Sequence, residues 1–211
     1  TPDAEYREAF TKAKLLTENL PPFELLESIR LDHGTYFLYQ RHLQRLKHSA
    51  AYVGFHLPMD HIHKRLRAYA NENADDVRKV RLLVSKEGDI TVSGEPVTDL
   101  HGPVPVKIAK TPVNKNDRFL YHKTTYRDMY EARRSEEPGV FDVILWNEQG
   151  ELTEFTNGNL VLELDGEKWT PPREAGLLDG TFRQELLSNG RIKERTLTKK
   201  DLHVCTNAWF I

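Results

Sequence analysis

The chain has 211 residues, and 30 Lys and Arg residues against 32 Asp and Glu residues give it a net charge of −2 at pH 7. This length can bury a substantial core in one large or two small domains. The balanced charge offers no basic excess to attract nucleic acid or an anionic membrane. One cysteine excludes an internal disulfide, and no apolar run approaches the ~20 residues of a membrane span. We expect a globular protein without bound metal, with the cytoplasm as the default compartment.

Residues 1–17 have the pattern of a short amphipathic helix. Thr1 can cap this helix, Pro2 fits its first turn, and one apolar stripe follows at helical spacing: Tyr6, Phe10, Ala13 and Leu16. Two consecutive prolines at positions 21 and 22 separate the helix from the rest of the chain. We interpret residues 1–20 as a helical appendage.

Residues 21–110 are predicted to form a small α+β domain. Two strands over residues 23–39 are joined by a tight turn at Gly34, and apolar residues then recur at helical spacing over residues 40–55 and 59–73. A second hairpin is predicted from residues 77–85 and 90–93. Prolines at positions 103, 105 and 112 and a polar run at 114–117 mark the connection to the second domain.

Residues 111–211 are predicted to form a larger domain. A helix ending near residue 134 is followed by strand patterns at 141–146, 151–155 and 159–164. A loop bounded by glycines at 176 and 180 then leads directly into a helix over residues 181–187. Two more strands are expected, near 192–197 and 203–210. The alternation of helices and hairpins in both domains predicts an α+β fold.

Lys123 is the first residue that could carry chemistry. It follows an apolar, aromatic run at 119–121 and precedes a segment whose helical spacing restarts at Tyr126, so we expect it to be half buried. Partial burial removes water from the ammonium group, lowers its pKa and makes the free amine available for Schiff-base formation. A lysine whose stem only covers apolar surface gives the same local pattern.

Two further features suit a phosphate-bearing aromatic aldehyde as the ligand. The loop at 176–180 directs the backbone N–H groups of Thr181 and Phe182 toward an anion site, where the guanidinium of Arg45 could bind the same phosphate. Glu154 lies on a predicted strand among apolar residues, and a buried carboxylate needs a cation such as a protonated pyridine nitrogen. An ordinary loop and an exposed strand-end glutamate remain the alternatives.

Seven sequence blocks in this order resemble the fold-type IV pyridoxal-phosphate enzymes, which include branched-chain and D-amino-acid aminotransferases and aminodeoxychorismate lyase. They are F-E-L-L-E-S-I-R, R-H-L-Q-R-L-K-H-S-A, H-K-T-T-Y-R, G-E-L-T-E-F-T-N-G-N-L, T-P-P, G-L-L-D-G-T-F-R and C-T-N-A. The resemblance spans residues 23–211 and implies a two-domain α+β fold like that of D-amino-acid aminotransferase, shorter at both ends than in the family. Within the family, three segments are most similar to the sequence of the lyase: H-K-T-T-Y-R, D-V-I-L-W-N-E and G-L-L-D-G.

The resemblance also implies roles for individual residues. Lys123 would bind the pyridoxal-phosphate aldehyde covalently and later move protons at the substrate carbons, and Glu154 would keep the pyridine nitrogen protonated. The phosphate would be held by Arg45, Gly180, Thr181 and Phe182, with Thr206 and Asn207 nearby. The substrate carboxylate would face Arg81, with Glu27 and Arg30 on the same side.

The function implied by the resemblance is a lyase of folate synthesis that converts 4-amino-4-deoxychorismate to p-aminobenzoate and pyruvate. An amino-acid aminotransferase with the same fold is the alternative enzyme. A catalytically degenerate domain, which would serve the neighbouring synthase structurally, is the alternative that is not an enzyme. The helix at 1–17 resembles the end of a chorismate-using synthase, which implies a fused or associated aminodeoxychorismate synthase. The family's site at a subunit interface implies a homodimer.

Overall fold

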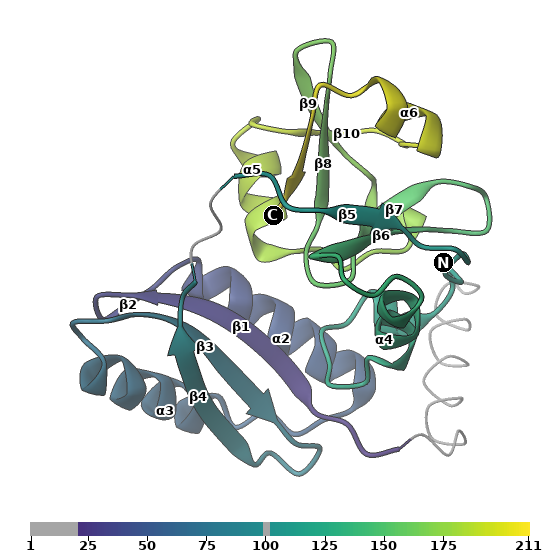
Figure 1. Cartoon of the computed structure of the whole chain (residues 1–211). Coiled ribbons are helices and arrows are strands. Elements are labelled where there is room, and N and C mark those ends of the chain that lie inside the picture. The colour runs from purple at the N-terminus through teal and green to yellow at the C-terminus, as the bar shows by residue number, and fades with distance from the viewer. Residues whose placement is uncertain (1–20, 99–101) are drawn as a thin grey trace. The chain divides into compact units, whose positions relative to one another are not determined.

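The computed structural model describes residues 21–98 and 102–211, so the helix predicted over residues 1–17 lies outside the described residues (Figure 1). The chain divides into two compact units: residues up to Val97 with Thr124–Tyr126, and Thr98–Lys123 with Arg127–Ile211. The division at Val97 comes earlier than the boundary near residue 110 that the prolines suggested. Among the helices in the described ranges, none is long and apolar enough to cross a membrane.

The first unit contains an antiparallel sheet with the strand order β2-β1-β3-β4. Its strands are β1 (Leu25–Asp32), β2 (Thr35–Tyr36), β3 (Val77–Val84) and β4 (Ile90–Pro96). Gly34 takes a φ of 78° in the turn between β1 and β2, as predicted. The second strand is shorter than expected, because Leu38 adopts a left-handed conformation and helix α2 begins at the next residue.

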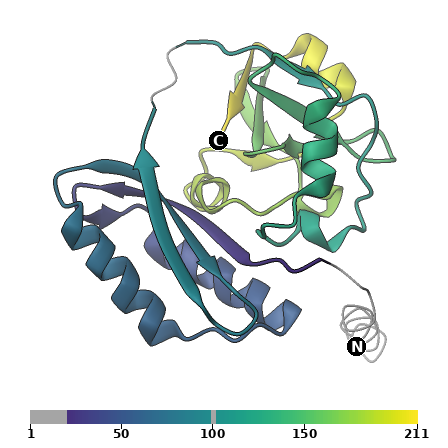
Figure 2. The same cartoon turned by 60° about the horizontal axis from the view of Figure 1, so that its bottom comes forward.

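Helices α2 (Tyr39–Val53) and α3 (Met59–Glu72) cover one face of this sheet (Figure 2). The odd-numbered residues of β1, from Leu25 to Leu31, point toward the helices, and the even-numbered residues point to the other face. The core between the helices and the sheet is aliphatic: Leu25, Leu31, Leu43, Leu46, Ala50, Ile62, Leu66, Ala70, Val80, Leu82 and Val84.

The second unit contains a three-stranded and a four-stranded sheet, with orders β5-β6-β7 and β10-β9-β8-β11. The first consists of β5 (Val106–Ile108), β6 (Asp142–Trp146) and β7 (Leu152–Phe155). The second consists of β8 (Leu160–Leu164), β9 (Glu167–Thr170), β10 (Lys193–Glu194) and β11 (Asn207–Phe210). β5 and β9 were not predicted, and β5 pairs in parallel with β6, which explains why the second unit begins before residue 110.

Five helical segments complete the second unit: η1 (Arg118–Leu120), α4 (Asp128–Ser135), η2 (Arg173–Ala175), α5 (Thr181–Ser188) and α6 (Lys199–Val204). The strand predicted over 203–210 is wrong in its first half. Thr198 and Asp201 form a capping box that starts α6, and the strand begins only at Asn207. The strand predicted near 192–197 is reduced to the two residues of β10.

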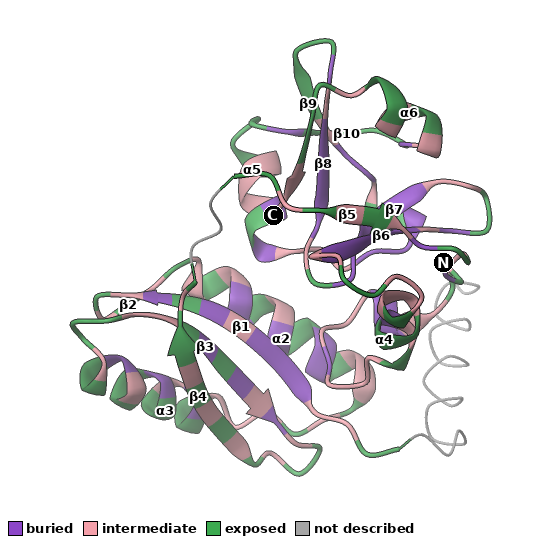
Figure 3. Ribbon diagram, in the orientation of Figure 1, coloured by how far each residue is buried: buried purple, intermediate pink, exposed green. Residues whose placement is uncertain are grey.

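Strand β6 is buried on both faces and separates two hydrophobic clusters (Figure 3). On one face, Val143 and Leu145 pack with Leu120 and with Tyr130 of α4. On the other face, Ile144 packs with residues of β7 and β8. This arrangement fixes α4 beside the sheet and brings its inner side chains toward β7.

Candidate functional site

The carboxylate of Glu154 is held from three directions inside the second unit. Glu154 lies on β7 with only 3% of its surface exposed. Its Oε1 accepts hydrogen bonds from the Tyr130 hydroxyl at 2.8 Å and from the backbone N–H of Leu178 at 3.2 Å. Its Oε2 accepts one from Nδ2 of Asn159 at 3.3 Å. Helix α4, the β7–β8 hairpin and the loop before α5 therefore meet at one carboxyl group.

This carboxyl group has no cationic partner within the described residues. Burial raises the pKa of Glu154 to about 8, while the hydrogen bonds from Tyr130 and Leu178 and the charges of Lys123 and Arg127 lower it by less. At neutral pH the group therefore retains its proton. A buried carboxyl that is hydrogen-bonded on both oxygens, but forms no ion pair, suits a basic or cationic group of a ligand.

We expect Glu154 to make the ligand-free protein less stable as pH rises. Between its ordinary pKa of 4.5 and about 8, the folded state keeps a proton that the unfolded state has lost. The free energy of unfolding should therefore fall by about 1.4 kcal/mol per pH unit relative to the Glu154→Gln variant, which cannot titrate. Urea denaturation of both proteins at several pH values in this window measures the difference. Parallel stability curves would show that the carboxyl is ionised in the fold.

Lys123 lies between η1 and α4 and is half buried, as predicted. Its neighbours Phe119 and Leu120 are buried, and Leu120 belongs to the cluster on the α4 side of β6. The charge of Lys123 lowers the pKa of Glu154, so the two residues interact electrostatically within one unit. The predicted catalytic amine therefore affects the protonation of the predicted ring-nitrogen partner.

The loop before α5 is fixed by a buried arginine that the sequence did not single out. Arg183 is 2% exposed, and its Nη1 pairs with Asp179 at 2.7 Å. Its Nη2 donates to the carbonyl oxygen of Pro171 at 2.8 Å and pairs with Glu194 at 2.5 Å. The first turn of α5 contains no acidic side chain, so its positive dipole end keeps its attraction for an anion.

Gly180 must be glycine because Asn159 lies against it. A Cβ at position 180 would collide with Oδ1 of Asn159, whose Nδ2 bonds the Leu178 carbonyl at 2.8 Å as well as Glu154. Gly180→Ala should displace Asn159 and weaken by about tenfold the pyridoxal-phosphate binding that the resemblance implies, the size of one lost hydrogen bond. Fluorescence titration measures the affinity. The control is Gly150→Ala, whose Cβ would meet nothing within 4 Å.

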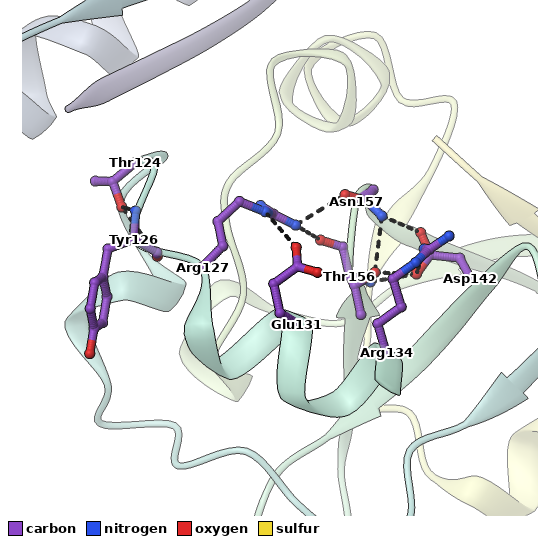
Figure 4. A network of polar contacts seen from close by, with 8 residues as sticks. All are labelled: Thr124, Tyr126, Arg127, Glu131, Arg134, Asp142, Thr156 and Asn157. Atoms are coloured by element: carbon purple, nitrogen blue, oxygen red, sulfur yellow. Dashed lines mark hydrogen bonds and ion pairs between the residues drawn. The ribbon is translucent and has the colours of Figure 1, made fainter. Parts of the chain in front are cut away.

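A polar network holds the β7–β8 turn against α4 (Figure 4). Arg127 donates to the Thr156 carbonyl at 2.7 Å and to Oδ1 of Asn157 at 3.0 Å. Buried Asp142 accepts hydrogen bonds from the Thr156 hydroxyl and from Nδ2 of Asn157, and Arg134 lies 3.6 Å from it. The turn that separates Glu154 from Asn159 is thereby fixed in place.

In the first unit, Arg45 forms a two-pronged ion pair with Glu27. Its Nε and Nη2 donate to Oε1 and Oε2 of Glu27 at 2.9 and 2.6 Å, and Nδ1 of His42 lies 2.7 Å from Oε2. Burial would raise the pKa of Glu27, but the charge of Arg45 and the hydrogen bonds from His42 and Arg45 hold it at about 2. Glu27 is therefore an anion that orients the Arg45 guanidinium.

The prediction that Glu27 lines the same side as Arg30 and Arg81 is wrong. Glu27 points toward α2, whereas Arg30 lies three residues later and projects from the opposite face. Arg81 is paired with Ser28 and shares the face of Arg30. Arg30 and Arg81 are both exposed, and Arg30 pairs with Asp32 at 2.9 Å.

Asn207 begins β11, and Thr206 immediately precedes it. Both bond to Glu163: the Thr206 hydroxyl to its carbonyl at 3.4 Å and Nδ2 of Asn207 to its carboxylate at 3.1 Å. The loop contacts Asn159, at the other end of β8. Four residues of strand, about 13 Å, separate the two positions. Their placement beside the phosphate remains a prediction.

Comparisons with known proteins agree on one family. Residues 24–211 match the family described as Amino-transferase class IV. A protein of Schizosaccharomyces pombe provisionally named an aminodeoxychorismate lyase is 35% identical over 178 residues, which are 80% of this chain and 76% of the relative. A Mesorhizobium loti structure provisionally named an amino-acid aminotransferase has a TM-score of 0.82 at 34% identity, over 88% of this chain and 92% of that one. A Mycobacterium tuberculosis structure described as a hypothetical aminotransferase in its PLP-bound form has a TM-score of 0.74 at 22% identity. The match covers 89% of this chain and 76% of that chain.

Proposed function

Because the chain belongs to the class IV aminotransferase family, we propose that it is a pyridoxal-phosphate-dependent lyase acting on 4-amino-4-deoxychorismate. The products would be p-aminobenzoate and pyruvate. One observation carries the cofactor assignment: Glu154 is buried and hydrogen-bonded on both oxygens, in the same unit as the half-buried Lys123. The choice of a lyase is supported by the Schizosaccharomyces pombe relative.

The residues of the second unit fit the three functional groups of pyridoxal phosphate. Glu154 offers a proton to a pyridine nitrogen, and Lys123 offers an amine to an aldehyde. The N-terminus of α5 offers backbone N–H groups to a phosphate, beginning at Gly180, which carries no side-chain cap. When bound, the cofactor supplies an electron sink for the carbon that carries the substrate amino group. Arg45, Arg30 and Arg81 belong to the first unit, and their assignments to phosphate and substrate carboxylate remain predictions.

Lys123 would act as the base of the reaction. Its Nζ would take the proton from the ring carbon that bears the amino group, and the enolpyruvyl oxygen would leave the neighbouring carbon. The six-membered ring becomes aromatic in this step, which makes the step strongly favourable, and the oxygen leaves as an enolate that becomes pyruvate by taking up a proton. Glu154 would keep the ring nitrogen protonated throughout.

An aminotransferase is the second candidate, favoured by the 34% identity to the Mesorhizobium loti protein over 92% of that chain. Such an enzyme returns to its starting state only when a keto acid accepts the amino group, whereas the lyase needs one substrate. A catalytically degenerate domain would bind no cofactor. A homodimer and an associated synthase remain predictions for each of these alternatives.

The experiment that separates these functions is product analysis with purified protein and pyridoxal phosphate. We expect aminodeoxychorismate alone to give p-aminobenzoate and pyruvate in equal amounts over many turnovers. One turnover followed by accumulation of the amine form of the cofactor, without pyruvate, would establish the aminotransferase. No spectral change on adding pyridoxal phosphate would leave only the degenerate domain.

A further inference from the structure

The hydroxyl of Tyr130 is directed at one oxygen of Glu154, and neither residue is exposed. Tyr130 is 7% exposed, and its hydroxyl donates to Oε1 at 2.8 Å. We propose that Tyr130 is a positioning residue, which occupies Oε1 so that Glu154 presents its proton on Oε2 to a basic nitrogen of the bound cofactor. This inference rests on the proposed function. It makes Tyr130, which the sequence motifs did not indicate, the residue that determines which oxygen of Glu154 carries the proton.

The hydrogen bonds around the carboxyl group distinguish its two oxygens. Oε1 accepts from Tyr130 and from the Leu178 N–H, and two donors fill its accepting positions. Oε2 has one donor, Nδ2 of Asn159 at the longer distance of 3.3 Å. The proton of a neutral Glu154 therefore belongs on Oε2, where a basic nitrogen can receive it.

The phenol can only act as a donor in this position. Burial raises the pKa of Tyr130 well above its ordinary value, and the charge and hydrogen bond of Glu154 raise it further. Its hydroxyl consequently keeps its proton at every pH at which the protein is used. Three titratable or charged side chains affect Glu154, namely Tyr130, Lys123 and Arg127, while Asn159 and Leu178 contribute neutral groups.

The ring of Tyr130 is held so that its hydroxyl cannot turn away. It packs in the cluster on the α4 side of β6, with Leu120, Val143 and Leu145. The guanidinium of Arg127 lies 4.7 Å from the ring centroid and is itself bonded to the β7–β8 turn at Thr156. The same arginine therefore connects the tyrosine to the hairpin that carries Glu154.

The first test uses ligand-free protein and does not depend on the cofactor. In protein labelled with ¹³C-glutamate, the Glu154 signal, assigned by its loss in Glu154→Gln, should titrate near pH 8. Tyr130→Phe removes a donor that favours the carboxylate, so the midpoint should move upward by about one pH unit. Tyr36→Phe is the matched control, because it removes a hydroxyl bonded to the Leu66 carbonyl at 2.9 Å in the other unit. An unchanged midpoint in Tyr130→Phe would overturn the inference.

The second test is a double-mutant cycle on pyridoxal-phosphate affinity. Tyr130→Phe alone should weaken binding by about tenfold, whereas in the Glu154→Gln background it should change binding by less than about twofold. Equal effects in both backgrounds would mean that Tyr130 only packs against its neighbours. If the unmodified protein binds no pyridoxal phosphate, the proposed function fails, and the titration still decides the role of Tyr130.

A measurement on the unmodified protein removes any dependence on how the variant folds. The Tyr130 hydroxyl proton should exchange slowly with water, and its NMR signal should move with the same pH midpoint as Glu154. A signal that stays constant through that midpoint would show that the two groups are not coupled, and would overturn the inference.

Discussion

Replacing Lys123 by alanine is expected to lower lyase turnover by about a thousandfold or more. The change removes the amine that would bind the aldehyde and transfer the proton, and a positioned acid–base group together with a covalent attachment contributes on this scale. The fold should survive, because the side chain is half exposed and its removal should change the free energy of unfolding by less than about 1 kcal/mol. Steady-state turnover and urea denaturation measure the two effects.

Lys107→Ala is the control for the loss of a lysine. Lys107 lies on β5 in the same unit, and its exposed ammonium group pairs with Glu137 at 2.7 Å. Its replacement should leave turnover within about twofold, because an exposed ion pair contributes little. If Lys123→Ala kept substantial turnover under the same conditions, another residue would be the base.

Replacing Glu154 by glutamine should lower turnover by about a hundredfold or more. The amide keeps the shape of the side chain and can still accept the hydrogen bond from Tyr130, but it has neither an acidic proton nor a negative charge to offer a ring nitrogen. Loss of electrostatic stabilisation at a reacting centre has effects of this size. The defect should appear in turnover with aminodeoxychorismate, even when the variant is saturated with cofactor.

Glu167→Gln is the control for the loss of a carboxylate. Glu167 lies on β9 in the same unit, is exposed, and pairs with Lys193 at 2.6 Å. Its replacement should leave turnover nearly unchanged. Near-full turnover in Glu154→Gln would mean that Glu154 does not face the ring nitrogen, although the cofactor could still be bound.

The family and the α+β fold were predictable because their signals are long and periodic. The helical spacing of α2 and α3 and the hairpin around residues 85–90 were confirmed nearly to their ends, and the hairpin around Gly34 was confirmed with a shorter second strand. The elements that were missed are short and depend on tertiary pairing or on a cap. β5 has three residues and exists through its pairing with β6, and the capping box of Thr198 and Asp201 starts α6 where a strand was expected.

The candidate site was only partly predictable, because local patterns do not specify long-range contacts. Lys123 and Glu154 were identified by their apolar surroundings, and the structure places them in one unit. Tyr130 and Asn159 were missed, since their hydrogen bonds to Glu154 depend on how α4, β7 and β8 pack. Glu27 was misassigned because the alternation of side chains along β1 was not applied to it.

The register of β11 determines which residues of β8 its motif faces. The motif that contains Thr206 and Asn207 resembles a block associated with the cofactor phosphate, but a motif does not specify which residues it will face. In the structure β11 runs antiparallel to β8, with Asn207 opposite Glu163 and Phe210 opposite Leu160. The end of β11 that adjoins Asn159 is therefore Phe210, and not Thr206 or Asn207.

The central claim is that Lys123 binds the aldehyde of pyridoxal phosphate covalently, in a site where Glu154 faces the ring nitrogen. Borohydride reduction of the cofactor-treated protein, followed by peptide mass analysis, tests it most directly. The account predicts one pyridoxyl adduct, on Lys123, present in Glu154→Gln and absent in Lys123→Ala. An adduct on another lysine, or no adduct in the unmodified protein under saturating cofactor, would contradict it.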